Sequence, residues 1–119
     1  LASSAAVNRA QPDLHALIDS AVDPAHLNIY LWHEARHEVT SRYFFNLNQA
    51  VIEDPGTGSA NCNLGAWAPA QGLAPLSWHV TQAELIGRPN HLHLSVTADG
   101  AISIGGRVMP FASGTLNIF

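Results

Sequence analysis

The chain contains no lysine, a single cysteine and no apolar run that approaches the ~18 residues needed to span a membrane. One cysteine cannot form an intrachain disulfide, which excludes a small fold stapled by disulfides. Five arginines face nine acidic residues, for a net charge of −4. Because affinity for phosphate backbones comes from clustered lysine and arginine, this balance argues against a nucleic-acid-binding protein.

Charged residues are also scarce. They make up 12% of the 119 residues, about half of the usual ~25%. Hydrophobic residues make up 47%, which excludes intrinsic disorder, and the length fits one domain of ~100–150 residues. The low charge predicts that part of the surface is covered by another domain or chain. We expect Leu1–Val7 to be the end of a strand.

The order of patterns predicts an α+β domain. Apolar residues at helical spacing predict a helix that opens at residues 11–13 and ends at Asp23-Pro24. Alternating residues predict a strand over 26–33, and β-branched and aromatic residues predict its hairpin partner over 38–46. A short helix over Ser59–Trp67, ended by Pro69, should follow. Further extended segments are expected at 78–86, 91–97, 101–104, 107–111 and 115–119. One helix could then lie against a curled antiparallel sheet.

A glycine-rich turn joins the predicted strand to the second helix. The amides of Gly58, Ser59 and Ala60 would lie at the helix start, where unpaired donors and the helix dipole favour anions. The Ser59 hydroxyl and the Asp54 carboxylate complete a workable site for a small carboxylate. An ordinary structural turn is the alternative. A nucleotide P-loop is excluded because the lysine is missing and the spacing differs.

The exact string of this turn carries a resemblance. Glu-Asp-Pro-x-Thr-Gly-Ser-Ala at 53–60, followed by Leu-Gly-Ala-Trp, resembles the central motif of the PhzF-like family of phenazine-biosynthesis isomerases. Four further stretches are similar to family motifs in the same order: Pro12-Asp13-Leu14, Arg42-Tyr43-Phe44, Gln82 with Gly87-Arg88-Pro89, and Ile104-Gly105-Gly106-Arg107-Val108. The sequence departs from the family pattern at Asn46, Ala50, Pro69 and Ala83.

The resemblance implies a diaminopimelate-epimerase-like fold of two similar domains. Each domain would be a curled, barrel-like, mostly antiparallel sheet around a central helix, with the active site between the domains. Residues 1–119 resemble the C-terminal domain alone. The implied activity is a cofactor-free isomerase or epimerase that shifts a proton on a small amino or hydroxy acid. Asp54 would be catalytic, and Thr57, Gly58, Ser59 and Ala60 would bind the substrate carboxylate.

The resemblance also implies that part of the machinery is elsewhere. The family's proton-shuttling glutamate and a glycine-histidine pair belong to its N-terminal domain and have no counterpart in this sequence. We therefore expect the chain alone to be inactive, as a fragment or as one half of a split protein. Its expected partners are the N-terminal domain or a second chain and, in a homodimer, another copy; the expected location is the cytoplasm. Alternatives are a module that binds a small carboxylate without turnover and a structural half that only docks.

Other candidate residues are given structural roles. We expect no metal site, because His33 and His37 flank a predicted turn and no further ligands lie at sensible spacing. His91 and His93 share one strand face, which could build a metal site but is expected to face solvent or a partner; His79 is expected at the surface or a rim. Cys62 is expected to be a small buried residue, and the three tryptophans to lie in the core or a domain interface: Trp32, Trp67 and Trp78.

Overall fold

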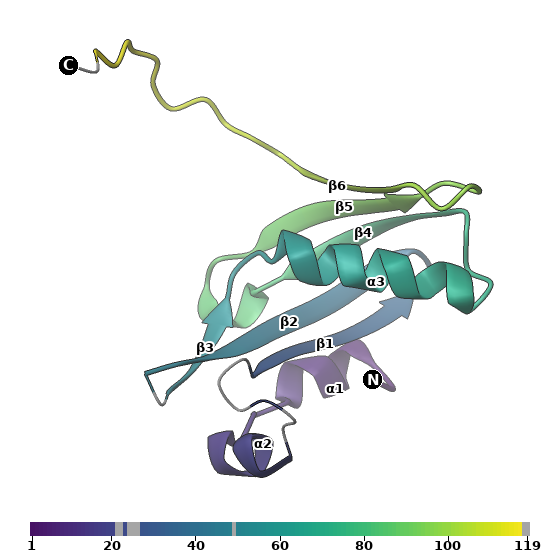
Figure 1. Ribbon diagram of the computed structural model, residues 1–119, viewed down its shortest axis with the longest axis vertical. Helices are drawn as coiled ribbons and strands as arrows, with labels where there is room; N and C mark the ends of the chain where they lie inside the picture. The colour runs from purple at the N-terminus through teal and green to yellow at the C-terminus, as the bar shows by residue number, and fades with distance from the viewer. Residues whose placement is uncertain (21–22, 24–26, 49, 118–119) are drawn as a thin grey trace.

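The computed structural model describes residues 1–20, 23, 27–48 and 50–117. Within these residues, three α-helices, one short 3₁₀ helix and six strands follow one another in an α+β order (Figure 1). Their bounds are α1 (Ser4–Arg9), α2 (Leu14–Ser20), β1 (Asn28–Ala35), β2 (Glu38–Leu47), β3 (Ala50–Asp54), α3 (Gly58–Ala70), β4 (Leu76–Gln82), η2 (Glu84–Ile86), β5 (Asn90–Val96) and β6 (Ile102–Gly106). Among these, no helix is both long and apolar enough to cross a bilayer.

The six strands form one mostly antiparallel sheet in the order β1-β2-β4-β5-β6, with β3 paired to β2. The predicted hairpin of β1 and β2 is confirmed, and it turns at Arg36 and His37, which both have positive φ. The first half of β2 pairs in parallel with β4, and its second half pairs with β3 instead. The sheet therefore splits beyond Ser41, and the ends of β3 and β4 meet at this split.

Helix α3 packs along one face of the sheet (Figure 1). Two of its buried side chains, Leu64 and Ala68, belong to a core that also contains Trp78, Val80, Leu94 and Val96. Gly65 permits the close contact, because a Cβ atom there would lie 2.9 Å from side-chain atoms of both Leu94 and Ile102. The described strands cover one side of α3 and do not close around it, so the expected wrapping on all sides is not seen.

The exposed side of α3 corrects a second expectation. Cys62, expected to be buried, is exposed, and Trp67 is 42% exposed. The helix also continues through Pro69 to Ala70, one residue beyond the expected stop. The solvent-exposed side of α3 has no charged residue and includes alanine, asparagine and tryptophan. Residue composition alone therefore does not distinguish the exposed side of the helix from its buried side.

The first residues form a helix, which overturns the expected strand at Leu1–Val7. The Ser3 hydroxyl accepts a hydrogen bond from the amide of Ala6 (3.0 Å) and caps α1, as serine commonly does. Val7 is buried. Figure 1 places α1 on the face of the β1–β2 hairpin that lies opposite α3.

One arginine of β2 ties α1 to the sheet. The Arg42 guanidinium donates to the carbonyl oxygens of Val7 (3.4 Å), Asn8 (3.2 Å) and Ala10 (2.7 Å) near the end of α1. The same group pairs with the carboxylate of Glu53 on β3 at 2.8 Å. We call this set of contacts the Arg42 clamp. A cation at a helix C-terminus also interacts favourably with the helix dipole.

The helix expected after residue 11 is confirmed as α2, where the Asp13 carboxylate accepts hydrogen bonds from the amides of His15 and Ala16. Its expected last turn and the Asp23-Pro24 stop fall largely outside the described residues. The extended segment expected over 78–86 is too long. Strand β4 ends at Gln82, where Ala83 adopts a left-handed conformation (φ 64°) and η2 begins.

Residues 107–117, here called the C-terminal arm, differ from their expectation. The β5–β6 hairpin forms with its predicted turn at Asp99-Gly100, but the strands expected at 107–111 and from 115 onward are absent from the described residues. Residues 118–119 lie outside them. The arm leaves the body of the protein (Figure 1), and its large apolar side chains are exposed: Val108, Met109, Phe111 and Leu116.

Candidate active site at the start of helix α3

The turn of residues 54–58 lies where the sheet splits. Asp54 is the last residue of β3, and α3 begins at Gly58. Gly56 lies against the side chain of Asn90 at the start of β5, and a Cβ atom on Gly56 would come within 2.2 Å of that side chain. The absence of a side chain at Gly56 therefore leaves room for Asn90, and any larger residue there would have to displace that side chain.

Thr57 is buried and orients the predicted catalytic carboxylate. Its hydroxyl donates a hydrogen bond to Oδ2 of Asp54. Thr57 is also the N-cap residue of α3, yet its side chain makes no capping hydrogen bond to the helix. Its hydroxyl and its amide both have protein partners, so Thr57 connects the turn to β4, and its predicted contact with a substrate stays a prediction.

The start of α3 is open to a ligand. Gly58 and Ser59 are exposed, while Ala60 is buried. The first amides of a helix have no intrahelical partner, and the helix dipole is positive at this end. Because Thr57 does not cap them, the N–H groups of Gly58 and Ser59 can donate to an anion. Gly58 and Ser59 lie at this exposed helix start, and substrate binding by the four residues stays a prediction.

Gln82 connects the turn to the sheet and is fully buried. Its Nε2 donates to the carbonyl oxygen of Asp54 (2.8 Å) and to Oγ1 of Thr57 (3.0 Å), and its Oε1 accepts from the amide of Thr57 (3.3 Å). In the sequence, Gln82 stands out only as part of a family-like motif with Gly87-Arg88-Pro89. The available signal was a polar residue at the buried position that follows Trp78 and Val80 in the alternation of β4.

A second buried amide supports the turn from inside the helix. Asn61 is fully buried; its Nδ2 donates to the carbonyl oxygen of Thr57 (2.9 Å), and its Oδ1 accepts from the Tyr30 hydroxyl (2.9 Å). Burial raises the pKa of Tyr30 to about 12. The spacing of residues in the helix gives no sign of this role, because Asn61 binds a backbone carbonyl oxygen of Thr57 and a side chain on β1.

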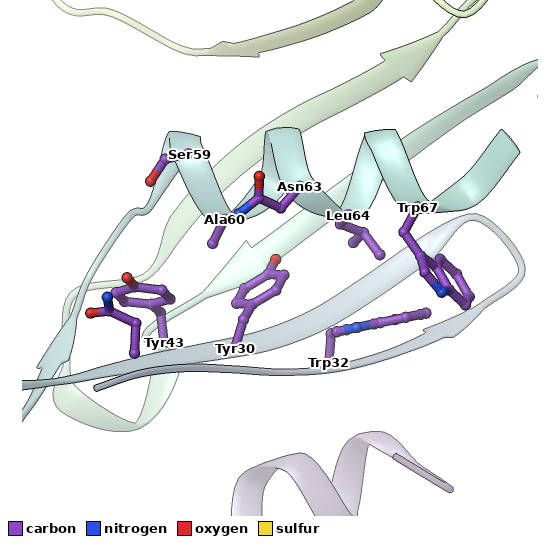
Figure 2. A pocket seen from close by; sticks show the side chains of 9 residues that line it. Tyr30, Trp32, Tyr43, Ser59, Ala60, Asn63, Leu64 and Trp67 are labelled. Carbon is purple, nitrogen blue, oxygen red and sulfur yellow. The ribbon is translucent and has the colours of Figure 1, made fainter. Parts of the chain in front are cut away.

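A cavity of about 630 Å³ runs beside α3, between the helix and the β1–β2 hairpin (Figure 2). We call it the aromatic groove. Its lining residues are uncharged: Asn28, Tyr30, Trp32, Tyr43, Ser59, Ala60, Asn63, Leu64 and Trp67. The Trp32 and Trp67 rings meet edge to face at 5.2 Å between centroids. Ser59 belongs to both the groove and the helix start, so the two form one continuous surface.

The histidines gather elsewhere. His79, His91 and His93 are exposed on adjacent strands and line a separate hollow of about 510 Å³ with Glu38 and Arg107. The His79 and His93 rings lie 5.4 Å apart between centroids. In the described part of the chain, no group of three or more histidine, cysteine or acidic side chains is arranged to hold a metal ion.

Comparison with known proteins agrees with these features. Residues 1–114 match the family described as phenazine biosynthesis-like protein. An uncharacterised isomerase of Pasteurella multocida (strain Pm70) is 44% identical over 88 residues. This match covers 74% of the chain but 30% of the relative's length, so the matched residues span less than a third of that protein. The motif at the sheet split therefore has a family context: the chain belongs to the phenazine biosynthesis-like family of proteins.

Proposed function

We propose that the chain is the C-terminal domain of a cofactor-independent isomerase or epimerase that shifts a proton on a small amino or hydroxy acid. The observation that carries the proposal is the placement of Asp54 beside an uncapped, exposed helix start. The family match and the isomerase relative support the reaction type. The two-domain arrangement, the cytoplasmic location and the homodimer belong to the same proposal.

In this mechanism, the amides of Gly58 and Ser59, with the Ser59 hydroxyl, bind the substrate carboxylate. Hydrogen bonds from preorganised backbone donors stabilise the negative charge that builds up when a proton leaves the carbon next to that carboxylate. The Thr57 hydroxyl binds Oδ2 of Asp54. We therefore assign Oδ1 of Asp54 to proton transfer with the substrate.

A proton shift needs a second acid–base group that faces the first across the substrate. Glu53 does not supply it, because its carboxylate is 8% exposed and paired with Arg42 at 2.8 Å. We assign the second group to an N-terminal domain, in the same polypeptide or in a partner chain. In that assembly the sheet would complete a barrel-like enclosure of α3. The 119-residue chain would then bind the carboxylate without turnover.

Binding is tested on the chain itself by NMR. Titration with L-lactate should move the amide signals of Gly58 and Ser59 first. The Ser59→Ala variant should bind more weakly, whereas Ser113→Ala in the C-terminal arm should not differ. Lactate-induced shifts confined to other parts of the chain would contradict the proposed site.

Catalysis is tested on a family-length protein that contains this domain, incubated with amino and hydroxy acids in deuterated water. Deuterium should enter the substrate next to the carboxylate, and Asp54→Asn should abolish its entry. Asp99→Asn, a matched change in the β5–β6 turn, should have no effect. Binding without deuterium exchange would favour the second candidate, a module that holds a small carboxylate without turnover.

A further inference from the structure

We infer that Gln82 is a positioning residue, which orients the Asp54 carboxylate through Thr57 and keeps the start of α3 uncapped. The inference rests on the proposed function for the role of Asp54 in proton transfer. Asp54, Thr57 and Gln82 meet where β3, β4 and α3 converge. Gln82 lies on β4, outside the motif at 53–60, and through its hydrogen bonds it controls the orientation of Asp54.

The first step is the burial of Gln82. The side chain is fully inaccessible, and a buried amide destabilises a protein unless its polar atoms are hydrogen-bonded. Its side chain forms hydrogen bonds with Asp54 and Thr57 of the turn. An apolar residue at this position would continue the buried pattern of Trp78 and Val80, but the glutamine there binds the turn instead.

The second step is the direction of these bonds. A backbone amide can only donate, so the Thr57 N–H requires the oxygen Oε1 of Gln82 on its side. That requirement turns Nε2 toward the carbonyl oxygen of Asp54 and Oγ1 of Thr57. The Thr57 hydroxyl accepts from Nε2 and keeps one proton to donate, which goes to Oδ2 of Asp54.

The third step concerns the helix. A threonine at the N-cap position usually accepts a hydrogen bond from an amide of the first helical turn. In this protein the Thr57 side chain makes no such bond. Nε2 of Gln82 donates to the Thr57 hydroxyl in place of a helix amide, and this contact holds the hydroxyl where its proton reaches Asp54. Without Gln82, we expect the Thr57 side chain to rotate toward α3, so that its oxygen caps a helix amide and its proton no longer reaches Asp54.

The experiment compares variants of the 119-residue chain by NMR without ligand. Gln82→Met keeps the side-chain length and removes its hydrogen bonds, and Gln71→Met is the matched control at the exposed end of α3. Three-bond couplings report whether the Asp54 side chain holds one χ1 rotamer. We expect one rotamer in the unsubstituted chain and the control, and rotamer averaging in Gln82→Met. A role in stability alone would lower the melting temperature and leave the rotamer unchanged.

A second pair of variants covers the case in which Gln82→Met does not fold. Thr57→Val removes the hydroxyl and should also release Asp54, while Thr57→Ser restores the hydroxyl and should restore the single rotamer. A single Asp54 rotamer in folded Gln82→Met or in Thr57→Val would overturn the inference, as would averaging in the unsubstituted chain.

Titration with L-lactate separates the inference from the proposed function. In Gln82→Met we expect the affinity to fall about tenfold, the order expected for loss of a hydrogen bond to a charged group. Absence of lactate binding to the unsubstituted chain would contradict the proposed function. The Asp54 rotamer would still decide the positioning role, because that readout requires no ligand.

Discussion

The turn at the start of α3 and the C-terminal arm differ in their contacts with distant parts of the chain. In the turn, Thr57 is held by Gln82, 25 residues away, and its conformation depends on contacts between distant segments. The arm has a strand-like sequence, but within the described residues it lies along no neighbouring strand. Contacts between distant segments therefore determine the local structure of both regions. A segment with a strand-like sequence does not form a strand when no neighbouring strand pairs with it.

The largest expected effect comes from matched leucine changes in the two regions. Leu94→Ala removes a side chain from the centre of the core beneath α3 and should lower the free energy of unfolding by about 3 kcal/mol. Leu116→Ala, the same change in the exposed arm, should alter it by less than about 0.5 kcal/mol. Denaturant unfolding measures both. Equal losses would show that the arm packs against the body.

Glycine variants sharpen the comparison. Gly65→Val should lower the free energy of unfolding by about 2 kcal/mol, because its Cβ atom would overlap side chains of Leu94 and Ile102. Gly114→Val in the arm meets no atom within 4 Å and should be nearly neutral. Thermal and denaturant unfolding provide the test. A neutral Gly65→Val would mean that α3 can move away from the sheet.

The phenol of Tyr30, which binds Asn61 beside the turn, should make the free energy of unfolding depend on pH. Burial raises its pKa from 10 to about 12 in the folded protein. Both states keep the proton below pH 10, where this stability is fully present. Above pH 10 the unfolded chain releases the proton first, so the free energy of unfolding should fall by about 1 kcal/mol between pH 9 and 11. This pH-dependent loss should vanish in Tyr30→Phe, as followed by denaturant titration at each pH.

The smallest effect on stability is expected for Phe111→Ser in the arm, below about 0.5 kcal/mol. Its effect should instead appear in association. Exposed apolar side chains promote contacts between molecules, so we expect the unsubstituted chain to self-associate at micromolar concentration and Phe111→Ser to do so less. Sedimentation velocity measures this. A clean monomer for the unsubstituted chain would contradict the expectation of a partner-covered surface.

The strands of the body could be predicted because their patterns match their contacts. Alternation along β5 matches one more buried and one more open face, the residue types of β1 and β2 favour strands, and Asp99-Gly100 marks a tight turn. The motif at 53–60 likewise indicated the turn that joins β3 to the start of α3, where Asp54, Gly58 and Ser59 lie. These features are local, so a short segment of sequence is enough to predict each of them.

The missed features depend on contacts that no local pattern records. Strand β3 is short and forms only where β2 changes partners, and α1 is held by side chains far along the chain. Gln82 and Asn61 act through hydrogen bonds across the fold. The arm was predicted as strands from its composition, but a strand also needs a neighbour to accept its hydrogen bonds.

The Arg42 clamp has a consequence for how related sequences can diverge. One guanidinium serves the carbonyl oxygens of α1 and the carboxylate of Glu53, the neighbour of Asp54 along β3. Removing Arg42 would leave Glu53 as an unpaired, largely buried charge, and removal of one partner from such a pair costs far more than replacement of both. Residues 42 and 53 should therefore covary among homologues, and the loss of either alone should be rare. Where both are replaced by apolar residues, α1 should lose the bonds that end it and become the most variable part of the domain.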